Sequence, residues 1–370
     1  MQPMPTAEFG SYIQRLIERR DLGRQECYRL FSELMRNSQS DLQQGAFLAA
    51  LAAKGETVDE MAGAWQAIDE FDTVHVVDLP ETIVDNSGTG MDGFKTFNVS
   101  SAAALVVAAH GIPVARHGAR AITSRCGTVD IMESVGINIE CEAELVAESV
   151  RQAGIGLFNG MSPLIHPGGL GRILSQIRFG TILNIAASLA HPARPSRALR
   201  GVYSAALVEP VARLMSTIGY RKALVVHGTL DGEQHGVDEL SVCGASTIAC
   251  LEDGSISRLE VTPEEAGISR HSAAAVAAAA SRQEETARFI SVAAGSGVYR
   301  ACEDFTALNA GALLWMCGSS CTLADGVADA RHTLTSGGAL DKLREWCGVQ
   351  ADPRGKGMQQ LIRLEKEVLQ

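Results

Sequence analysis

The first 71 residues carry apolar side chains at helical spacing. From residue 8 onward these side chains recur every three or four positions, and the pattern breaks at residues 21–23, 37–41 and 54–57. We therefore expect three or four short helices, without a strand between them, packed as a bundle-like lobe. Their apolar residues exceed what so small a bundle buries alone, so a second chain or the rest of this chain should cover one face.

From residue 74 the pattern changes to short β-branched runs that alternate with alanine-rich segments. Such alternation is typical of an α/β lobe with a mainly parallel sheet flanked by helices. The expected strands are residues 74–77, 82–85, 112–116, 137–140, 223–227, 239–242 and 256–261. The expected helices are residues 101–109, 131–135, 142–153 and 208–218, together with an alanine-rich helix over 272–296.

One passage interrupts the α/β pattern. Residues 163–188 are helical and glycine-spaced, and we expect them to return to the helical lobe. The expected division is therefore a helical lobe of residues 1–73, joined by 163–188, and an α/β lobe of residues 74–162 and 189–370. The total of 370 residues exceeds the length at which a single core stops growing, which favours two lobes.

Composition narrows the classes of partner. The chain has 43 acidic and 32 basic side chains, a formal net charge of −11, which gives no general attraction to nucleic acid or to an anionic membrane. Nine scattered cysteines without paired spacing favour reduced thiols. The N-terminus lacks the apolar core of a signal peptide, and the longest apolar run, residues 102–109, is too short to span a bilayer. We expect a cytoplasmic protein.

The chemistry concentrates in residues 86–130. Gly88, Gly90 and Gly93 follow an expected strand, and Asn98 or Ser100 can cap the helix behind them. A strand, a glycine loop and a capped helix together present free backbone N–H groups to an anion. Four side chains that can carry positive charge follow in the same stretch: Arg116, His117, Arg120 and Arg125. The stretch predicts a phosphate site.

Two other interpretations of the glycine loop remain open. A dinucleotide fingerprint would need its third glycine at the helix start and an acidic residue about 20 positions on. Here Asp92 lies within the loop and Arg116 stands near the required distance, which leaves only an NADP site conceivable. A glycine turn without a ligand is the simplest alternative. Phosphate binding is favoured over it by additional hydroxyl and amide donors at the helix start: Thr96, Asn98, Ser100 and Ser101.

Asp238 and Glu239 form an adjacent pair of carboxylates. On a strand they would point to opposite faces, whereas at a turn both can reach one divalent cation. On spacing alone, solvated carboxylates are the favoured interpretation.

His117 is a candidate base but is more typical of a phosphate contact, and Cys126 is either a stabilised thiolate or a small apolar filler. We find no HExxH, nucleophile-elbow or Walker motif.

Together these residues resemble the anthranilate phosphoribosyltransferase family, nearly end to end. That family carries a GTGGDG loop, a TFN-I-ST segment, a KHGNR segment and a serine-rich loop ending in GSAD. The matching segments here are residues 88–93, 96–101, 116–120 and 124–130, and residues 54–57 match the helical lobe. The family's metal-binding Asp-Glu pair is matched by Asp238 and Glu239.

The resemblance implies a nucleoside phosphorylase/phosphoribosyltransferase-like fold, a homodimer formed through the helical lobe, and Mg²⁺-dependent transfer from phosphoribosyl pyrophosphate (PRPP). It implies PRPP contacts at Gly88, Thr89, Gly90, Asp92, Gly93, Thr96, Asn98, Ser100, Ser101, Arg116 and Thr128. It implies catalytic roles for Arg116, His117 and Arg120, and metal ligands at Ser100, Asp238 and Glu239. The implied acceptor pocket contains Ala119, Asn159, His166, Arg172 and Arg178.

The departures from the family pattern gather at the acceptor end. Met91 replaces the second consecutive glycine of the loop, and Ala119 replaces the asparagine that contacts anthranilate. Only Arg172 or Arg178 remains to face a carboxylate. We therefore expect phosphoribosyl transfer to a small aromatic acceptor, with anthranilate modestly favoured, in tryptophan biosynthesis. The alternatives are another amine or heterocycle, a non-catalytic nucleic-acid-binding descendant, and a nucleoside phosphorylase of the related fold.

Overall fold

The computed structural model describes residues 3–120, 127–177, 179–233 and 235–369. The helices before the first strand are α1 (Thr6–Ile17), α2 (Arg24–Met35), α3 (Asp41–Lys54) and α4 (Val58–Phe71). The strands are β1 (Val84–Gly88), β2 (Val114–Gly118), β3 (Ile155–Asn159), β4 (Arg197–Gly201), β5 (Lys222–Gly228), β6 (Ser246–Glu252) and β7 (Ser255–Val261). The helices between the strands are α5 (Val99–Ala109), α6 (Thr128–Ser134), α7 (Ala143–Ala153), α8 (Leu170–Gln176), α9 (Leu183–Leu189), η1 (Ala205–Leu207) and α10 (Val208–Thr217). The C-terminal helices are α11 (Ala273–Val276), α12 (Arg282–Ala293), α13 (Arg300–Met316), α14 (Leu323–Thr335), α15 (Gly338–Val349) and α16 (Lys356–Leu369).

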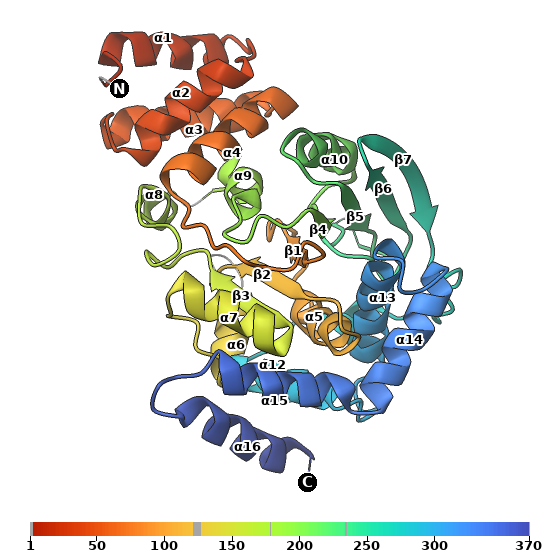
Figure 1. Ribbon diagram of the computed structural model, residues 1–370. Helices are drawn as coiled ribbons and strands as arrows, with labels where there is room; N and C mark the ends of the chain where they lie inside the picture. Colours follow the sequence, from red (N-terminus) through yellow and green to blue (C-terminus); the bar gives the residue numbers. More distant parts are fainter. Residues whose placement is uncertain (1–2, 121–126, 178, 234, 370) are drawn as a thin grey trace.

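The seven strands form one sheet in the order β3-β2-β1-β4-β5-β6-β7 (Figure 1). The first five strands of this order are parallel, and β6 and β7 are antiparallel additions at one edge. The expected mainly parallel sheet flanked by helices is confirmed. β1 lies at the switch point of the order, because β2 and β3 extend to one side of it and β4 to the other.

The two largest apolar cores lie on opposite faces of the sheet, and a smaller third cluster includes Ala115 of β2 and Phe158 of β3. Alternate residues of β4 divide between the two largest cores: Ala198 packs with α1–α4, α9 and α10, and Leu199 packs with α5 and the C-terminal helices. The core of the helical lobe is therefore continuous with one face of the sheet. Figure 1 shows α4, α9 and α10 on that side of the strands. The division at residue 73 stays a prediction.

Several expected elements are wrong. Residues 74–77, 137–140 and 239–242 form no strand, and 272–296 is not one helix but α11 and α12 joined by an extended segment. Val74 and Val76 donate main-chain hydrogen bonds to loop carbonyls instead of to a strand. The alanine-rich helix breaks where Ala277 pairs with Thr96 in an isolated bridge, so a tertiary contact overrides helix propensity. β3, β4 and β6 were not expected.

The helix ends agree with the local sequence. Thr57 and Glu60 form a capping box at the start of α4, and Ser40 caps α3. In the part of the chain that the structure describes, no helix is long and apolar enough to cross a bilayer.

Candidate active site

A cavity of about 450 Å³ opens at the carboxyl ends of β1, β2 and β3. Ligands of open α/β sheets bind at this edge, beside the switch point. Its lining includes the β1 loop from Ser87 to Asp92, the start of α5, the end of β2, the segment around α8 and α9, and the carboxylates that follow β5. The glycine loop, the capped helix and the carboxylate pair thus meet in one place.

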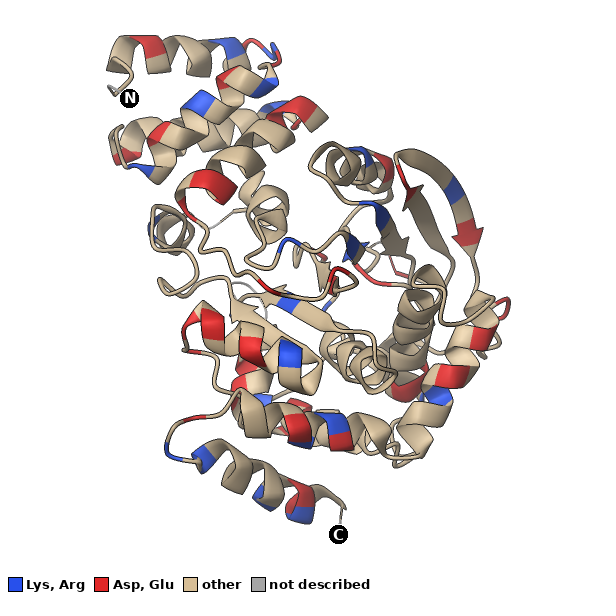
Figure 2. Cartoon of the chain, viewed as in Figure 1, with Lys and Arg blue, Asp and Glu red and all other residues tan. Residues whose placement is uncertain are grey.

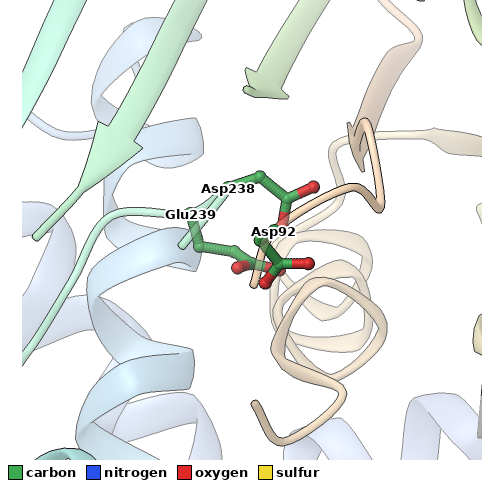
Figure 3. Close-up of side chains that lie close together, drawn as sticks. All are labelled: Asp92, Asp238 and Glu239. Atoms are coloured by element: carbon green, nitrogen blue, oxygen red, sulfur yellow. The ribbon is translucent and has the colours of Figure 1, made fainter. Parts of the chain in front are cut away.

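Three carboxylates converge in this cavity. Asp92, Asp238 and Glu239 each offer an oxygen, and these oxygens lie within 4.8 Å of one another (Figure 3). Asp238 and Glu239 lie in a bend, not on a strand, so both can face the same space. The pair therefore has the geometry that a shared divalent cation requires, and Asp92 extends it to three ligands.

The electrostatics of this cluster favour a cation. Burial and the neighbouring Asp238 raise the pKa of Asp92 to about 7, and burial with Asp238 raises the pKa of Glu239 well above its usual range. The Oε2 atom of Glu239 is buried and has no hydrogen-bond partner among the described residues. Lys95 offsets part of the charge, with its Nζ 2.8 Å from the Asp92 Oδ1 atom. The donor set, hard oxygens with one buried oxygen unsatisfied, fits Mg²⁺.

Glycines permit the close approach of Asp238 to β1 and β4. A Cβ on Gly88 would overlap the Asp238 carboxylate, and one on Gly201 would overlap the Asp238 main-chain oxygen. Gly90 serves differently: its φ is +69°, and its N–H donates to the Asp238 Oδ2 atom at 2.7 Å. Gly93 does not line the cavity, because the ring of His235 packs against it.

The start of α5 presents polar groups to the cavity. Asn98 is the N-cap residue but makes no side-chain capping bond, and its Oδ1 atom is buried without a partner among the described residues. Thr96 and Ser100 line the same wall, as does Thr128 at the start of α6. Unpaired N–H groups and hydroxyls at a helix N-terminus are suited to an anion such as a phosphate.

Arg116 and Ser101 are hydrogen-bonded to each other beside the cavity. The Arg116 Nη1 atom donates to the Ser101 Oγ atom at 2.5 Å, and its Nε atom donates to the Asn86 Oδ1 atom at 2.9 Å. Ser101 is fully buried and does not line the cavity. Burial lowers the pKa of Arg116 to about 10. Arg116 lines the cavity, whereas Ser101 lies behind the wall and holds the Arg116 guanidinium; the expected contact of the Ser101 hydroxyl with PRPP stays a prediction.

Arg120 and His117 both line the cavity. Arg120 is shared among Asp130, Glu133 and Glu140, which hold its pKa above the usual range. His117 lies in a cluster of buried histidines, its Nε2 atom 3.1 Å from the Nε2 atom of His166. Burial and the neighbouring histidines lower the pKa of His117 well below its usual range, so its ring is neutral.

The histidine cluster predicts acid sensitivity. Burial lowers the pKa of His166 to about 4, whereas an unfolded histidine titrates near 6.5, so the folded state binds fewer protons. This contribution to stability is complete above about pH 6.5 and is lost as the pH falls toward 4, on the order of 3 kcal/mol for one group. We expect His166→Gln to flatten the fall of the unfolding free energy between pH 6.5 and 4, measured by urea unfolding.

The exposed His110 provides the control for this experiment. His110→Gln should leave the slope of the unfolding free energy against pH unchanged. An unchanged slope in His166→Gln would contradict the assignment of a buried, neutral ring.

The residues expected at the acceptor end divide between the cavity and its surroundings. Ala119 lines the cavity. Asn159 is buried behind it and donates to the Glu140 Oε1 atom, and His166 reaches the cavity only through His117. Arg172 points away, bonded to Asp41, Gln44 and the Leu34 carbonyl, so the expectation that it faces the acceptor is wrong. Arg178, Arg125 and Cys126 lie outside the described residues.

The sequence analysis missed several contributors. Asp92 was expected to contact PRPP but not to join the carboxylate pair, and Lys95 and Glu285 were not singled out. Glu285 lies on α12 and accepts from the main chain of Asn98, a contact that no local spacing signals. An apolar part of the lining, called the apolar wall below, was also missed; it consists of Leu170, Leu174, Ile177, Phe179 and Leu183.

The fold and the site define a transferase of a known type: a helical bundle followed by an α/β lobe with an anion and metal site at the sheet's switch point. A family model described as "glycosyl transferase family, helical bundle domain" matches residues 10–71, and one described as "glycosyl transferase family, a/b domain" matches residues 80–340. The chain belongs to this glycosyl transferase family, that of the anthranilate phosphoribosyltransferases.

The relatives cover nearly the whole chain. The anthranilate phosphoribosyltransferase of Methanothermobacter thermautotrophicus is 35% identical over 344 residues, 92% of this chain and 97% of the relative. The enzyme of that name from Nitrobacter hamburgensis is 37% identical over 331 residues, 89% and 94% of the two chains. The crystal structure of the enzyme from Thermus thermophilus superposes with a TM-score of 0.82 at 30% identity, covering 91% of this chain and 98% of that one. The Saccharomyces cerevisiae enzyme in complex with PRPP and Mg, at 23% identity and a TM-score of 0.80, shares the fold.

Proposed function

We propose that the protein transfers the phosphoribosyl group of PRPP, with Mg²⁺, to a nitrogen of a small aromatic acceptor. One observation carries the proposal: Asp92, Asp238 and Glu239 converge beside a glycine loop and a helix N-terminus in one cavity. Relatives named for transfer to anthranilate make anthranilate the first acceptor to test, which would place the protein in tryptophan biosynthesis.

The polar part of the cavity lining suits a pyrophosphate. Asp92, Asp238 and Glu239 would hold Mg²⁺, which supplies charge stabilisation to the departing pyrophosphate when bound. Thr96, Ser100 and Thr128 contribute hydroxyls to the same wall, and the start of α5 contributes N–H groups.

The bonds that change in this reaction belong to PRPP and the acceptor and not to the protein. The bond between the ribose anomeric carbon and the pyrophosphate oxygen breaks, a bond from the acceptor nitrogen forms, and that nitrogen loses a proton. The anomeric carbon becomes oxocarbenium-like, so stabilising the leaving charge and aligning the nitrogen account for most of the catalysis. The proton passes to water, because the lowered pKa of His117 makes its ring a weak base; the neutral ring at the cavity wall is suited to a hydrogen-bonding role.

The alternatives have different support. Another aromatic amine or heterocycle is supported by Ala119 and by the apolar wall. A nucleic-acid-binding descendant has less support, because the net charge is −11 and acidic and basic segments are interspersed in the view of Figure 2.

Two further expectations, a homodimer and a cytoplasmic location, accompany the proposal. A homodimer through the helical lobe is supported by the exposed Ile17 and Leu42, 62% and 86% accessible, at the ends of the packed helices α1 and α3. A cytoplasmic location is supported by the eight described cysteines, all free thiols.

A screen of acceptors tests the proposal. We expect Mg²⁺-dependent release of pyrophosphate from PRPP with anthranilate or with another member of a panel of aromatic amines and nitrogen heterocycles. The release is measured with a coupled pyrophosphate assay. Release with another amine but not with anthranilate would show that the acceptor is not anthranilate. Release with none of them would contradict the proposed function.

A further inference from the structure

Met91 is the residue of the glycine loop that least resembles its family. A large side chain in a phosphate-binding loop would be expected to hinder the approach of the backbone to the ligand. In the structure the Met91 side chain packs against Gly180. A Cβ built on Gly180 would overlap the Met91 Cε atom and lie 3.0 Å from its Sδ atom. Met91 therefore lies over the segment between α8 and α9.

Gly180 is glycine for a spatial reason. Its backbone is not among those with a positive φ, so an L side chain is allowed conformationally. The obstacle is the thioether of Met91, which occupies the place where a side chain at 180 would begin. The side chain of Met91, from the glycine loop, therefore occupies the volume that a side chain at residue 180 would need.

The thioether adds to an apolar surface. Met91 and Gly180 line the cavity together with the apolar wall defined above. Phe179, beside Gly180, is 49% exposed although it is aromatic. The carboxylates, the hydroxyls and the helix N-terminus line the same cavity, so its lining combines polar groups suited to an anion with apolar side chains suited to an apolar molecule.

We propose that Met91 is a specificity-determining residue for the acceptor, and that the acceptor presents an uncharged aromatic edge to its thioether. Sulfur packs well against aromatic rings, whereas a charged group pressed against this surface would lose its hydration without compensation. This inference rests on the proposed function and names the face of the acceptor that the site recognises.

Steady-state kinetics with Met91→Ala tests it. For the best acceptor of the screen, we expect kcat/KM to fall about 10- to 100-fold, mostly through the acceptor KM, as for the loss of a buried apolar side chain. The KM for PRPP should stay within about threefold, and the volume-conserving Met91→Leu should restore most of the acceptor affinity. An unchanged acceptor KM, or an equal rise in both KM values, would overturn the inference.

A double-mutant cycle tests the shared volume. Gly180→Ala alone should raise the acceptor KM, because the new methyl group displaces the thioether. In the Met91→Ala background the same change should have little further effect. Strict additivity of the two changes would contradict a shared volume.

A binding experiment separates this inference from the proposed function. Calorimetry with benzimidazole and aniline as probes needs no turnover, and we expect Met91→Ala to bind them at least tenfold more weakly than the unchanged chain does. Equal binding, or no binding of either probe to the unchanged chain at millimolar concentration, would overturn the inference. Failure of turnover with intact probe binding would instead count against the proposed function.

Discussion

Replacing Asp238 by Asn and Glu239 by Gln together is expected to lower Mg²⁺-dependent PRPP turnover by about 10³-fold or more. The two changes keep the shapes of the side chains but remove two of the three charges that converge in the cavity. Burial and then the charge of Asp238 raise the pKa of Asp92 and of Glu239; the two changes remove that repulsion and the buried carboxyl of Glu239, so the metal-free protein should be no less stable. Turnover is measured by pyrophosphate release and stability by thermal unfolding.

The control for this pair is Glu233→Gln, which changes an exposed carboxylate in the preceding loop. It should leave turnover and its dependence on Mg²⁺ concentration unchanged. Unaltered turnover in the Asp238→Asn, Glu239→Gln protein would rule out the metal site.

Gly88→Ala is expected to lower turnover by about 10²-fold. The new methyl group would overlap the Asp238 carboxylate, which must then move away from Asp92 and Glu239. A displacement of about 1 Å in a catalytic constellation typically costs this much, and overpacking costs a further 1–3 kcal/mol or so of stability. The apparent affinity for Mg²⁺, obtained from turnover against Mg²⁺ concentration, should fall as well.

Gly90→Ala is the matched comparison within the same loop. No neighbour lies within 4 Å of a Cβ there, but the φ of +69° disfavours alanine by about 1–2 kcal/mol. We expect a loss of stability with a smaller loss of Mg²⁺ affinity than in Gly88→Ala. The reverse order would contradict the argument that Gly88 is required for space.

The parts of the site that the sequence predicted are local in the chain. Gly88, Gly90 and the start of α5 follow one another, so turn and capping preferences were sufficient to indicate an anion site. The contact of Asp92 with Asp238 and Glu239 was not predictable from spacing, because the sheet's strand order creates it. Arg172 was misplaced for the same reason, since its partners Asp41 and Gln44 lie on α3.

The strands show the same limit. β4, with the sequence RALRG, contains no β-branched residue, and it is a strand because it pairs with β1 and β5 on either side. Residues 74–77 have the composition of a strand, but the main-chain N–H groups of Val74 and Val76 donate to loop carbonyls and not to a neighbouring strand. Propensity describes a segment, whereas membership of a sheet depends on its neighbours.

The central claim is that Asp92, Asp238 and Glu239 form, with the glycine loop, one Mg²⁺-dependent site for PRPP. Calorimetric titration of PRPP into the protein with and without Mg²⁺ tests it most directly. We predict saturable heat with Mg²⁺ and at least tenfold weaker binding without it, and the loss of this difference in the Asp238→Asn, Glu239→Gln protein. No heat with millimolar PRPP and Mg²⁺, or equal binding in the absence of Mg²⁺, would contradict the claim.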